Sequence, residues 1–137
     1  MARVEFHMPD DFLSKVASLG EHTDEIIPRV LEAGGEVALN AVRNGLHASL
    51  SGESSGELTR ALGLSPAKMD QDGNYNVKVG FDEPRRDGSS NAMVANIIEY
   101  GKHGQPPRPF LKPAKSAARA PAIAAMKSKL EDELRSL

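Results

Sequence analysis

The chain has 137 residues and a formal net charge of −2; 39% of its residues are apolar but only 4% are aromatic. This length indicates one domain, residues 1–137, and so few large apolar residues indicate a modest, mostly aliphatic core that oligomerisation would stabilise. The charge excludes a globally basic nucleic-acid-binding protein but leaves a local basic surface open. The absence of Cys excludes disulfides and thiolate chemistry and favours a reducing cytoplasm as the place of synthesis.

The hydropathy pattern gives no sign of export or of membrane insertion. No basic segment followed by an apolar run stands at the start, so we expect no signal peptide. No stretch approaches the roughly 20 apolar residues that span a bilayer, so we expect no membrane partner. The sequence therefore predicts a soluble protein that is intracellular when made.

The first half of the chain is predicted to be mainly helical. Alternating residues at 4–8 predict a short strand, and Pro9 opens a short helix that Gly20 ends. The longest helix is predicted from Thr23 to about Leu50. Its apolar residues lie on more than one side, which predicts two neighbouring elements and leaves room for another subunit as one of them.

The middle of the chain is predicted to form an antiparallel hairpin. A Ser/Gly-rich stretch at 51–56 predicts a flexible loop, and 57–62 predicts one or two helical turns. Two alternating segments at 64–69 and 75–81 then flank a turn that contains Asp72-Gly73. An Asp-Gly step between alternating segments is a strong hairpin signal.

A polar stretch at 82–91 predicts an exposed, mobile loop. Ser89, Ser90 or Asn91 can cap a helix that runs to Tyr100 and ends at Gly101. Four apolar residues of this helix are predicted to share one face: Met93, Val94, Ile97 and Ile98.

Residues 102–109 contain three prolines and a glycine, so they predict an extended connector. A last helix is predicted at about 112–136, with a kink or break before Pro121. Together the elements predict an α+β fold. In it, a small antiparallel sheet packs on the long N-terminal helix, accompanied by a further helix and a C-terminal helix.

No residue pattern indicates catalysis, a cofactor or a metal site. The four histidines are isolated from one another in the sequence: His7, His22, His47 and His103. Asp70 and Asp72 resemble the start of a calcium loop, but Phe81 stands where that loop needs a bidentate Glu. Phosphate-cradling and nucleophile-elbow motifs are also absent. The sequence therefore predicts that the protein is not an enzyme and holds no cofactor.

Charge is distributed unevenly along the chain. Residues 1–57 hold ten acids against four bases, whereas no acid lies between Glu99 and Glu131. That acid-free segment holds seven bases: Lys102, Arg108, Lys112, Lys115, Arg119, Lys127 and Lys129. The bases could form a solvated face, contact DNA phosphates, or meet the acidic helices of a neighbouring subunit head to tail. Of the two binding interpretations we favour the subunit contact, since no aromatic residues alternate with the bases to stack on nucleotides. The candidate subunit contacts are Lys112, Lys115, Arg119 and Lys127.

The most specific segment is Ile97-Ile98-Glu99-Tyr100-Gly101 followed, after a Pro-rich spacer, by Pro107-Arg108-Pro109-Phe110-Leu111-Lys112-Pro113-Ala114. It resembles the "(V/I)E(F/Y)G … (A/P)RPFL(R/K)PA" signature of the small tail-component, or tail-completion, proteins of long-tailed double-stranded DNA bacteriophages and prophages. The segment Ser55-Gly56-Glu57-Leu58-Thr59-Arg60-Ala61-Leu62 is similar to that family's "TG-x-L-x-x-S-I" element. It departs from the family at Ser55 and Ala61-Leu62, which leaves the subfamily open.

The resemblance implies a structural virion protein, made in the host cytoplasm, that forms a ring of about six copies at the head–tail junction. It also implies three partners, namely the tail terminator, the head-completion (stopper) protein and the tape measure. Two alternatives stay open. One is a tail terminator that caps the tail tube, and the other is a DNA-binding accessory protein that uses the basic segment 102–129.

The signature residues are Glu99, Tyr100, Gly101, Arg108, Pro109, Phe110, Leu111 and Pro113. Pro109 and Pro113 fix φ on both sides of Phe110, so its ring is presented with little conformational entropy left to lose. We therefore predict that Phe110 fills the core under the sheet. Arg108 is predicted to pair with Glu99 or with a neighbouring subunit.

Overall fold

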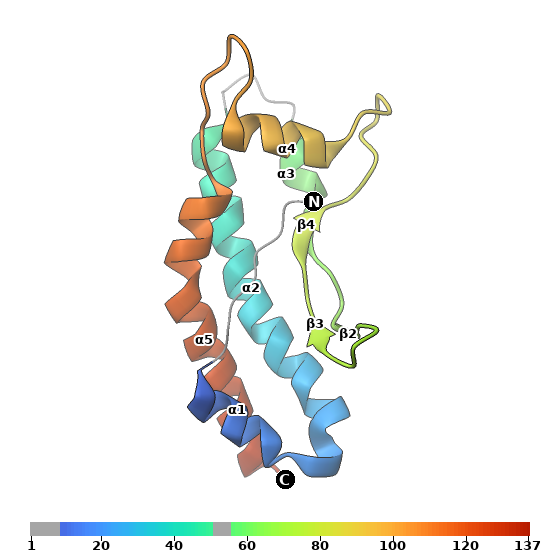
Figure 1. The fold of residues 1–137 in the computed structure, drawn as a ribbon, viewed down its shortest axis with the longest axis vertical. Helices are drawn as coiled ribbons and strands as arrows, with labels where there is room; N and C mark the ends of the chain where they lie inside the picture. Colours follow the sequence, from blue (N-terminus) through green and yellow to red (C-terminus); the bar gives the residue numbers. More distant parts are fainter. Residues whose placement is uncertain (1–8, 51–55) are drawn as a thin grey trace.

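The computed structural model describes residues 9–50 and 56–137. Two long helices, α2 (Thr23–Ser49) and α5 (Leu111–Arg135), lie side by side and run in opposite directions (Figure 1). A small antiparallel sheet packs on another side of α2. The fold class is therefore α+β, as predicted. The strand predicted at 4–8 lies outside the described residues.

Shorter helices close the two ends of this arrangement. At one end, α3 (Glu57–Ala61) contacts α4 (Asn91–Tyr100), which lies across the end of the long helices (Figure 1). At the other end, α1 (Asp10–Ala17) packs on α5, and a 3₁₀ turn at Gly20–His22 leads into α2. In the described part of the chain, no helix is both long and apolar enough to cross a membrane.

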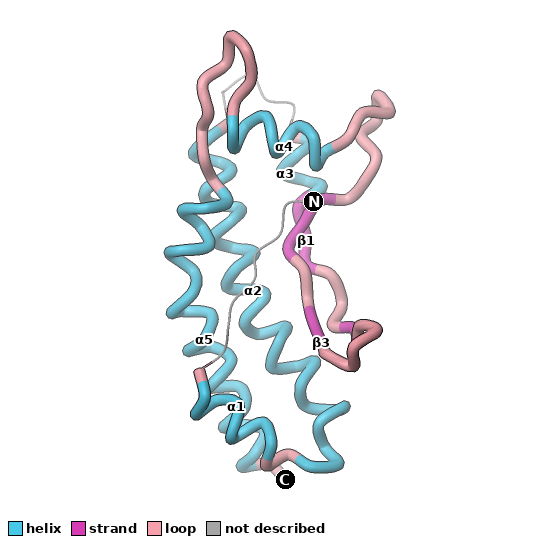
Figure 2. Tube along the Cα trace, in the orientation of Figure 1, coloured by secondary structure: helices cyan, strands magenta, loops and turns pink. Residues whose placement is uncertain are grey.

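The sheet consists of two short ladders (Figure 2). One pairs β1 (Leu62–Leu64) with β4 (Val79–Phe81), and the other pairs β2 (Lys68–Met69) with β3 (Tyr75–Asn76); both are antiparallel. The prediction of two continuous strands is therefore wrong, although the hairpin is confirmed.

The interruption between the ladders follows from Pro66, which has no backbone N–H to donate across the hairpin. Beside it, Ser65 keeps the two sides together. Its N–H donates to the Lys78 carbonyl at 2.8 Å, and its hydroxyl accepts from the Lys78 N–H at 2.8 Å. At the tip of the hairpin, the Asp70 carboxylate accepts the N–H groups of Asp72 and Asn74, both at 2.9 Å.

Two adjacent glycines let α2 pack closely against both neighbours. A Cβ on Gly34 would lie 2.5 Å from Met126 Cγ of α5, and a Cβ on Gly35 would lie 2.7 Å from Leu64 Cδ1 of β1. Both apolar sides of α2 are thus covered within the chain, by α5 and by the sheet. Neither side is left for the additional subunit that the sequence allowed.

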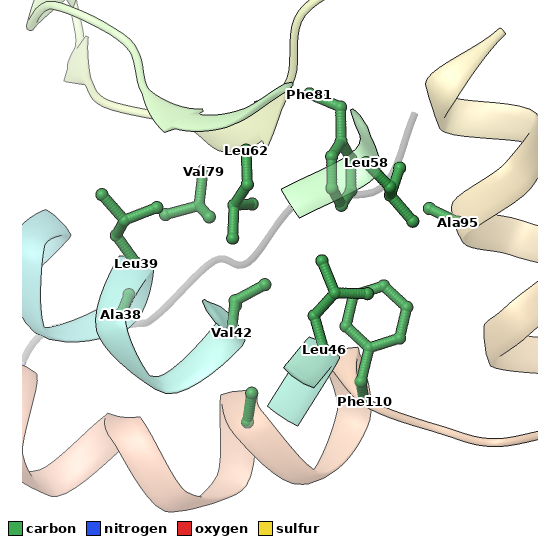
Figure 3. Packing of buried hydrophobic residues seen from close by; sticks show 11 residues of the cluster. Ala38, Leu39, Val42, Leu46, Leu58, Leu62, Val79, Phe81, Ala95 and Phe110 are labelled. Carbon is green, nitrogen blue, oxygen red and sulfur yellow. The ribbon is translucent and has the colours of Figure 1, made fainter. Parts of the chain in front are cut away.

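The core divides into two clusters along the long helices. The first joins α2, α3, the sheet, α4 and the start of α5, and Figure 3 shows its side chains: Ala38, Leu39, Val42, Leu46, Leu58, Leu62, Val79, Phe81, Ala95, Phe110 and Ala114. The second joins α1, α2 and the end of α5: Phe12, Leu19, Ile26, Val30, Met126 and Leu130.

Two predictions about helices need correction. Of the predicted kink or break before Pro121, the break is wrong, because α5 is continuous through Pro121, and the kink stays a prediction. Pro121 and Ala117 both lie on the exposed side, where water can bond the Ala117 carbonyl that proline leaves without a donor. In α4, the predicted shared face fails because Met93 is 63% exposed, whereas Ala95 and Glu99 are buried. Val94 and Ile98 do pack against the first cluster.

Candidate functional site

The residues that carry the sequence motif meet where α4 ends and α5 begins. Glu99, in the last turn of α4, is only 2% exposed. One carboxylate oxygen accepts the backbone N–H groups of Phe110 at 2.7 Å and Leu111 at 2.8 Å, and the other accepts that of Lys112 at 3.2 Å.

This carboxylate accounts for all the free donors at the start of α5. The first N–H groups of a helix have no partner within the helix. The residue at the N-cap is Phe110, whose side chain offers no acceptor. Glu99 satisfies three donors, Pro113 has none, and Ala114 N–H makes the first bond within the helix, to Phe110. Its negative charge also suits the positive end of the helix dipole.

Gly101 makes the turn out of α4. It has φ 78° and ψ 178°, and its N–H donates to the Ile97 carbonyl at 2.7 Å. A Cβ at this position would lie 2.8 Å from both the Gln105 carbonyl oxygen and the Pro107 nitrogen. Only glycine therefore fits both the backbone conformation and the close approach.

The connector is tighter than the extended segment that was predicted. Lys102 and Gln105 form an antiparallel bridge, after which the Arg108 N–H donates to the Ile98 carbonyl at 2.7 Å. The side chain of Arg108 does not pair with Glu99, whose carboxylate is occupied by backbone donors. Its guanidinium donates instead to the Ser49 carbonyl at 3.4 Å, at the negative end of α2.

Phe110 fills the core as predicted. It is 1% exposed, and its ring meets that of Phe81 edge to face, with centroids 6.5 Å apart (Figure 3). Its backbone also packs closely on α2, since a Cβ on Gly45 would lie 3.1 Å from the Phe110 carbonyl oxygen. Among the other signature residues, Leu111 is half-buried and packs on the same cluster, whereas Pro109 and Pro113 are exposed.

A second carboxylate, which sequence reasoning missed, holds the loop at 82–91. Glu83 accepts the N–H groups of Asn91 at 2.9 Å and Ala92 at 2.6 Å, so it caps α4 together with the predicted cap Ser90. The hydrogen bond from Ala92, helped by that from Asn91, holds the pKa of Glu83 below its ordinary value.

The loop at 82–91 also contacts α3, where the Arg86 N–H donates to Glu57 at 2.7 Å. Its mobility stays a prediction.

The four basic residues proposed as subunit contacts differ in their surroundings. The Lys112 ammonium lies over the ring of the exposed Tyr100, 5.6 Å from its centroid. Lys127 pairs with Asp11 of α1 at 3.2 Å, and the hydrogen bond from Lys127 lowers the pKa of that carboxyl. Lys115 and Arg119 are exposed and make no ion pair or hydrogen bond with the described residues.

A shallow open depression lies on α5 between Arg119 and Lys127. Its lining residues are Arg119, Ala120, Ile123, Ala124 and Lys127. Within residues 9–50 and 56–137, no group of three or more histidine or carboxylate side chains could hold a metal ion. The arrangement is thus a helix junction held by three hydrogen bonds to one buried carboxylate, beside exposed bases of α5.

Comparisons of the chain with protein-family models, with curated proteins and with solved structures give no match. The likeness of the segment 97–114 to tail-completion proteins is therefore an inference from the motif itself.

Proposed function

We propose that the chain is a structural subunit of a long-tailed double-stranded DNA bacteriophage, a tail-completion or neck protein that acts by assembling with copies of itself. It would form a ring of about six subunits at the head–tail junction of the virion, since heterologous contacts that close generate rings. Its partners there would be the tail terminator, the head-completion protein and the tape measure.

The observation that carries this proposal is the use of the motif at the junction of α4 and α5. Its one buried ionisable residue, Glu99, directs both carboxylate oxygens at backbone N–H groups, and its one buried aromatic residue, Phe110, is part of the core. The segment that carries the family resemblance therefore serves as architecture. Such a rigid junction suits a protein whose function is to present fixed surfaces to its neighbours.

Immunogold electron microscopy tests the proposal directly. An antibody against the purified chain would be applied to particles released after induction of the host strain. We expect gold at the junction between head and tail. Intact particles without label in every fraction, alongside free chain in the lysate, would refute a virion role.

Deletion of the gene separates the proposal from its two alternatives. Loss of a tail-completion protein should give filled heads beside unattached tails of normal length. Loss of a tail terminator should give tails of uncontrolled length. A DNA-binding accessory protein should leave assembled particles intact, and its purified form should bind duplex DNA with a steep salt dependence.

A further inference from the structure

Most basic residues of α5 interact with other residues of the chain, with two exceptions. The engaged ones are Lys112 over Tyr100, Lys127 with Asp11, Lys129 with Glu133 and Arg135 with Asp132. Lys115 and Arg119, one helical turn apart, make no ion pair or hydrogen bond with the described residues. Two like charges four residues apart destabilise a helix slightly. No acidic side chain of the described residues offsets this repulsion between Lys115 and Arg119.

The acidic residues of α2 also fall into two groups, those with a partner among the described residues and those without one. Asp24 accepts the Tyr75 hydroxyl at 2.5 Å, and Glu25 lies 3.8 Å from Arg29. Glu32 and Glu36 are exposed, are also one turn apart, and have no such partner in the part of the chain that the structure describes.

The acidic pair points away from the helix that carries the basic pair. Gly34 of α2 packs against Met126 of α5. At about 100° of rotation per residue, Glu36 lies about 200° around α2 from Gly34, which is close to the opposite side. The two pairs therefore do not meet within one molecule, but they can meet between two.

We propose that Glu32 and Glu36 of one copy bind Lys115 and Arg119 of the next copy, head to tail. In each helix the two charges are about 6 Å apart along the axis, so two helices can align both pairs at once. The small side chains of Ala120 and Ala124 beside Arg119 let a second surface come close. Because the two surfaces differ, the contact is heterologous and repeats into a ring or a filament. This inference deepens the proposed function by naming the contact between subunits.

Cysteine cross-linking tests the contact without background, because the chain contains no Cys. Two separate proteins, Glu36→Cys and Arg119→Cys, would be mixed and treated with a short bismaleimide. We expect covalent dimers in the mixture and far fewer in either protein alone. Dimers of Glu36→Cys with itself at the same yield would indicate a symmetric contact and overturn the proposal.

Charge reversal provides the complementary test, read by sedimentation at low salt. Reversing Lys115 and Arg119 to Glu, or Glu32 and Glu36 to Lys, should weaken self-association about tenfold or more, because attraction becomes repulsion. The variant with all four changes should recover it. Lys68→Glu with Lys78→Glu, the same charge change on the hairpin, should leave association unchanged.

The outcomes separate this contact from the virion role. A wild-type chain that stays monomeric at millimolar concentration, or reversals without effect, would overturn the contact even if gold marks the head–tail junction. Cross-linking and rescue as expected would sustain it even if particles carry no label. Unchanged association together with lost duplex DNA binding in the Lys115/Arg119 variant would assign the basic pair to DNA instead.

Discussion

Glu99 shows how one buried side chain can determine the start of a distant helix. Between Glu99 and the N–H of Leu111 lie a turn and a Pro-rich connector, yet the carboxylate reaches three consecutive backbone donors. Without it, the N–H of the fully buried Phe110 would have no acceptor. A buried donor without a partner costs about 1–3 kcal/mol.

Replacing Glu99 by Ala should therefore lower the free energy of unfolding by roughly 3 kcal/mol, since three donors lose their acceptor and the helix loses its cap. Glu99→Gln should fall in between, because it keeps one acceptor oxygen. Urea unfolding followed by circular dichroism measures both changes. The Glu21→Gln variant is the control and should stay within about 0.5 kcal/mol, because the Glu21 side chain is 91% exposed. A Glu99→Ala protein as stable as this control would contradict the capping role.

Sequence reasoning found these residues but assigned one interaction wrongly. It predicted that Phe110 is buried, which the structure confirms. It also predicted that Arg108 pairs with Glu99 or with a neighbouring subunit, and the first of these pairings is wrong. Competition from backbone donors is invisible in a charge pattern. One signal was available: α5 has Phe at its N-cap instead of Ser, Thr, Asp or Asn, so an acceptor had to come from elsewhere. Glu83 left no such signal, because α4 begins with the ordinary cap Ser90.

At the scale of elements, two glycines of the connector allow a matched comparison. Gly101 and Gly104 both have positive φ, 78° and 80°. A Cβ on Gly101 meets backbone atoms at 2.8 Å, whereas a Cβ on Gly104 meets nothing within 4 Å. Gly104→Ala should cost about 1 kcal/mol for its backbone conformation alone, and Gly101→Ala roughly 3 kcal/mol or more. Thermal unfolding of the two variants checks the difference. Equal costs would mean that the close approach at Gly101 does not matter.

The docking of α1 on α5 should depend on pH. Hydrogen bonds from Lys127 and Lys15 lower the pKa values of Asp11 and Glu131 in the folded protein. Both contacts therefore stabilise docking above the unfolded pKa values of about 4, and they are lost as the pH falls through the lower folded values.

We expect the amides of α1 to lose protection in acid before those of α2, by hydrogen exchange corrected for intrinsic rates. Lys15→Ala with Lys127→Ala should weaken this pH dependence, because the hydrogen bonds that contribute most to the lowered pKa values of Asp11 and Glu131 are removed. Unchanged protection of α1 through the acid range would show that its docking depends on Phe12 and not on these ion pairs.

The positions of the helices could be predicted closely, because long periodic patterns and capping residues determine them. The ends of α2, α4 and α5 lie within a residue or so of the predicted ones. The bounds of the strands could not be predicted, since whether Pro66 interrupts a ladder depends on how the opposite strand pairs with it. The effect of Pro121 was likewise decided by exposure, which depends on how α5 packs. For the candidate site, the sequence identified the charged residues but not which of them stay unpaired.

At the scale of the whole molecule, two core clusters share the two long helices. Each cluster lies toward one end of the pair of long helices, and both α2 and α5 contribute residues to both clusters. The close contact of Gly34 with Met126 lies in the second cluster, and that of Gly45 with Phe110 lies in the first. The helices therefore act as a common frame, while α1 at one end and α4 with the sheet at the other depend on separate sets of contacts.

This division predicts different consequences for two comparable core changes, Phe110→Ala in the first cluster and Leu130→Ala in the second. Both side chains are at most 1% exposed, so each change should cost roughly 2–5 kcal/mol of global stability. Under native conditions, Leu130→Ala should raise exchange mainly in α1 and the adjoining helix ends, and Phe110→Ala mainly in α4 and the sheet. Hydrogen exchange read peptide by peptide by mass spectrometry distinguishes the two patterns. If each variant raised exchange uniformly from end to end, the clusters would form one cooperative unit, and the helical frame would couple them more strongly than their separate contacts indicate.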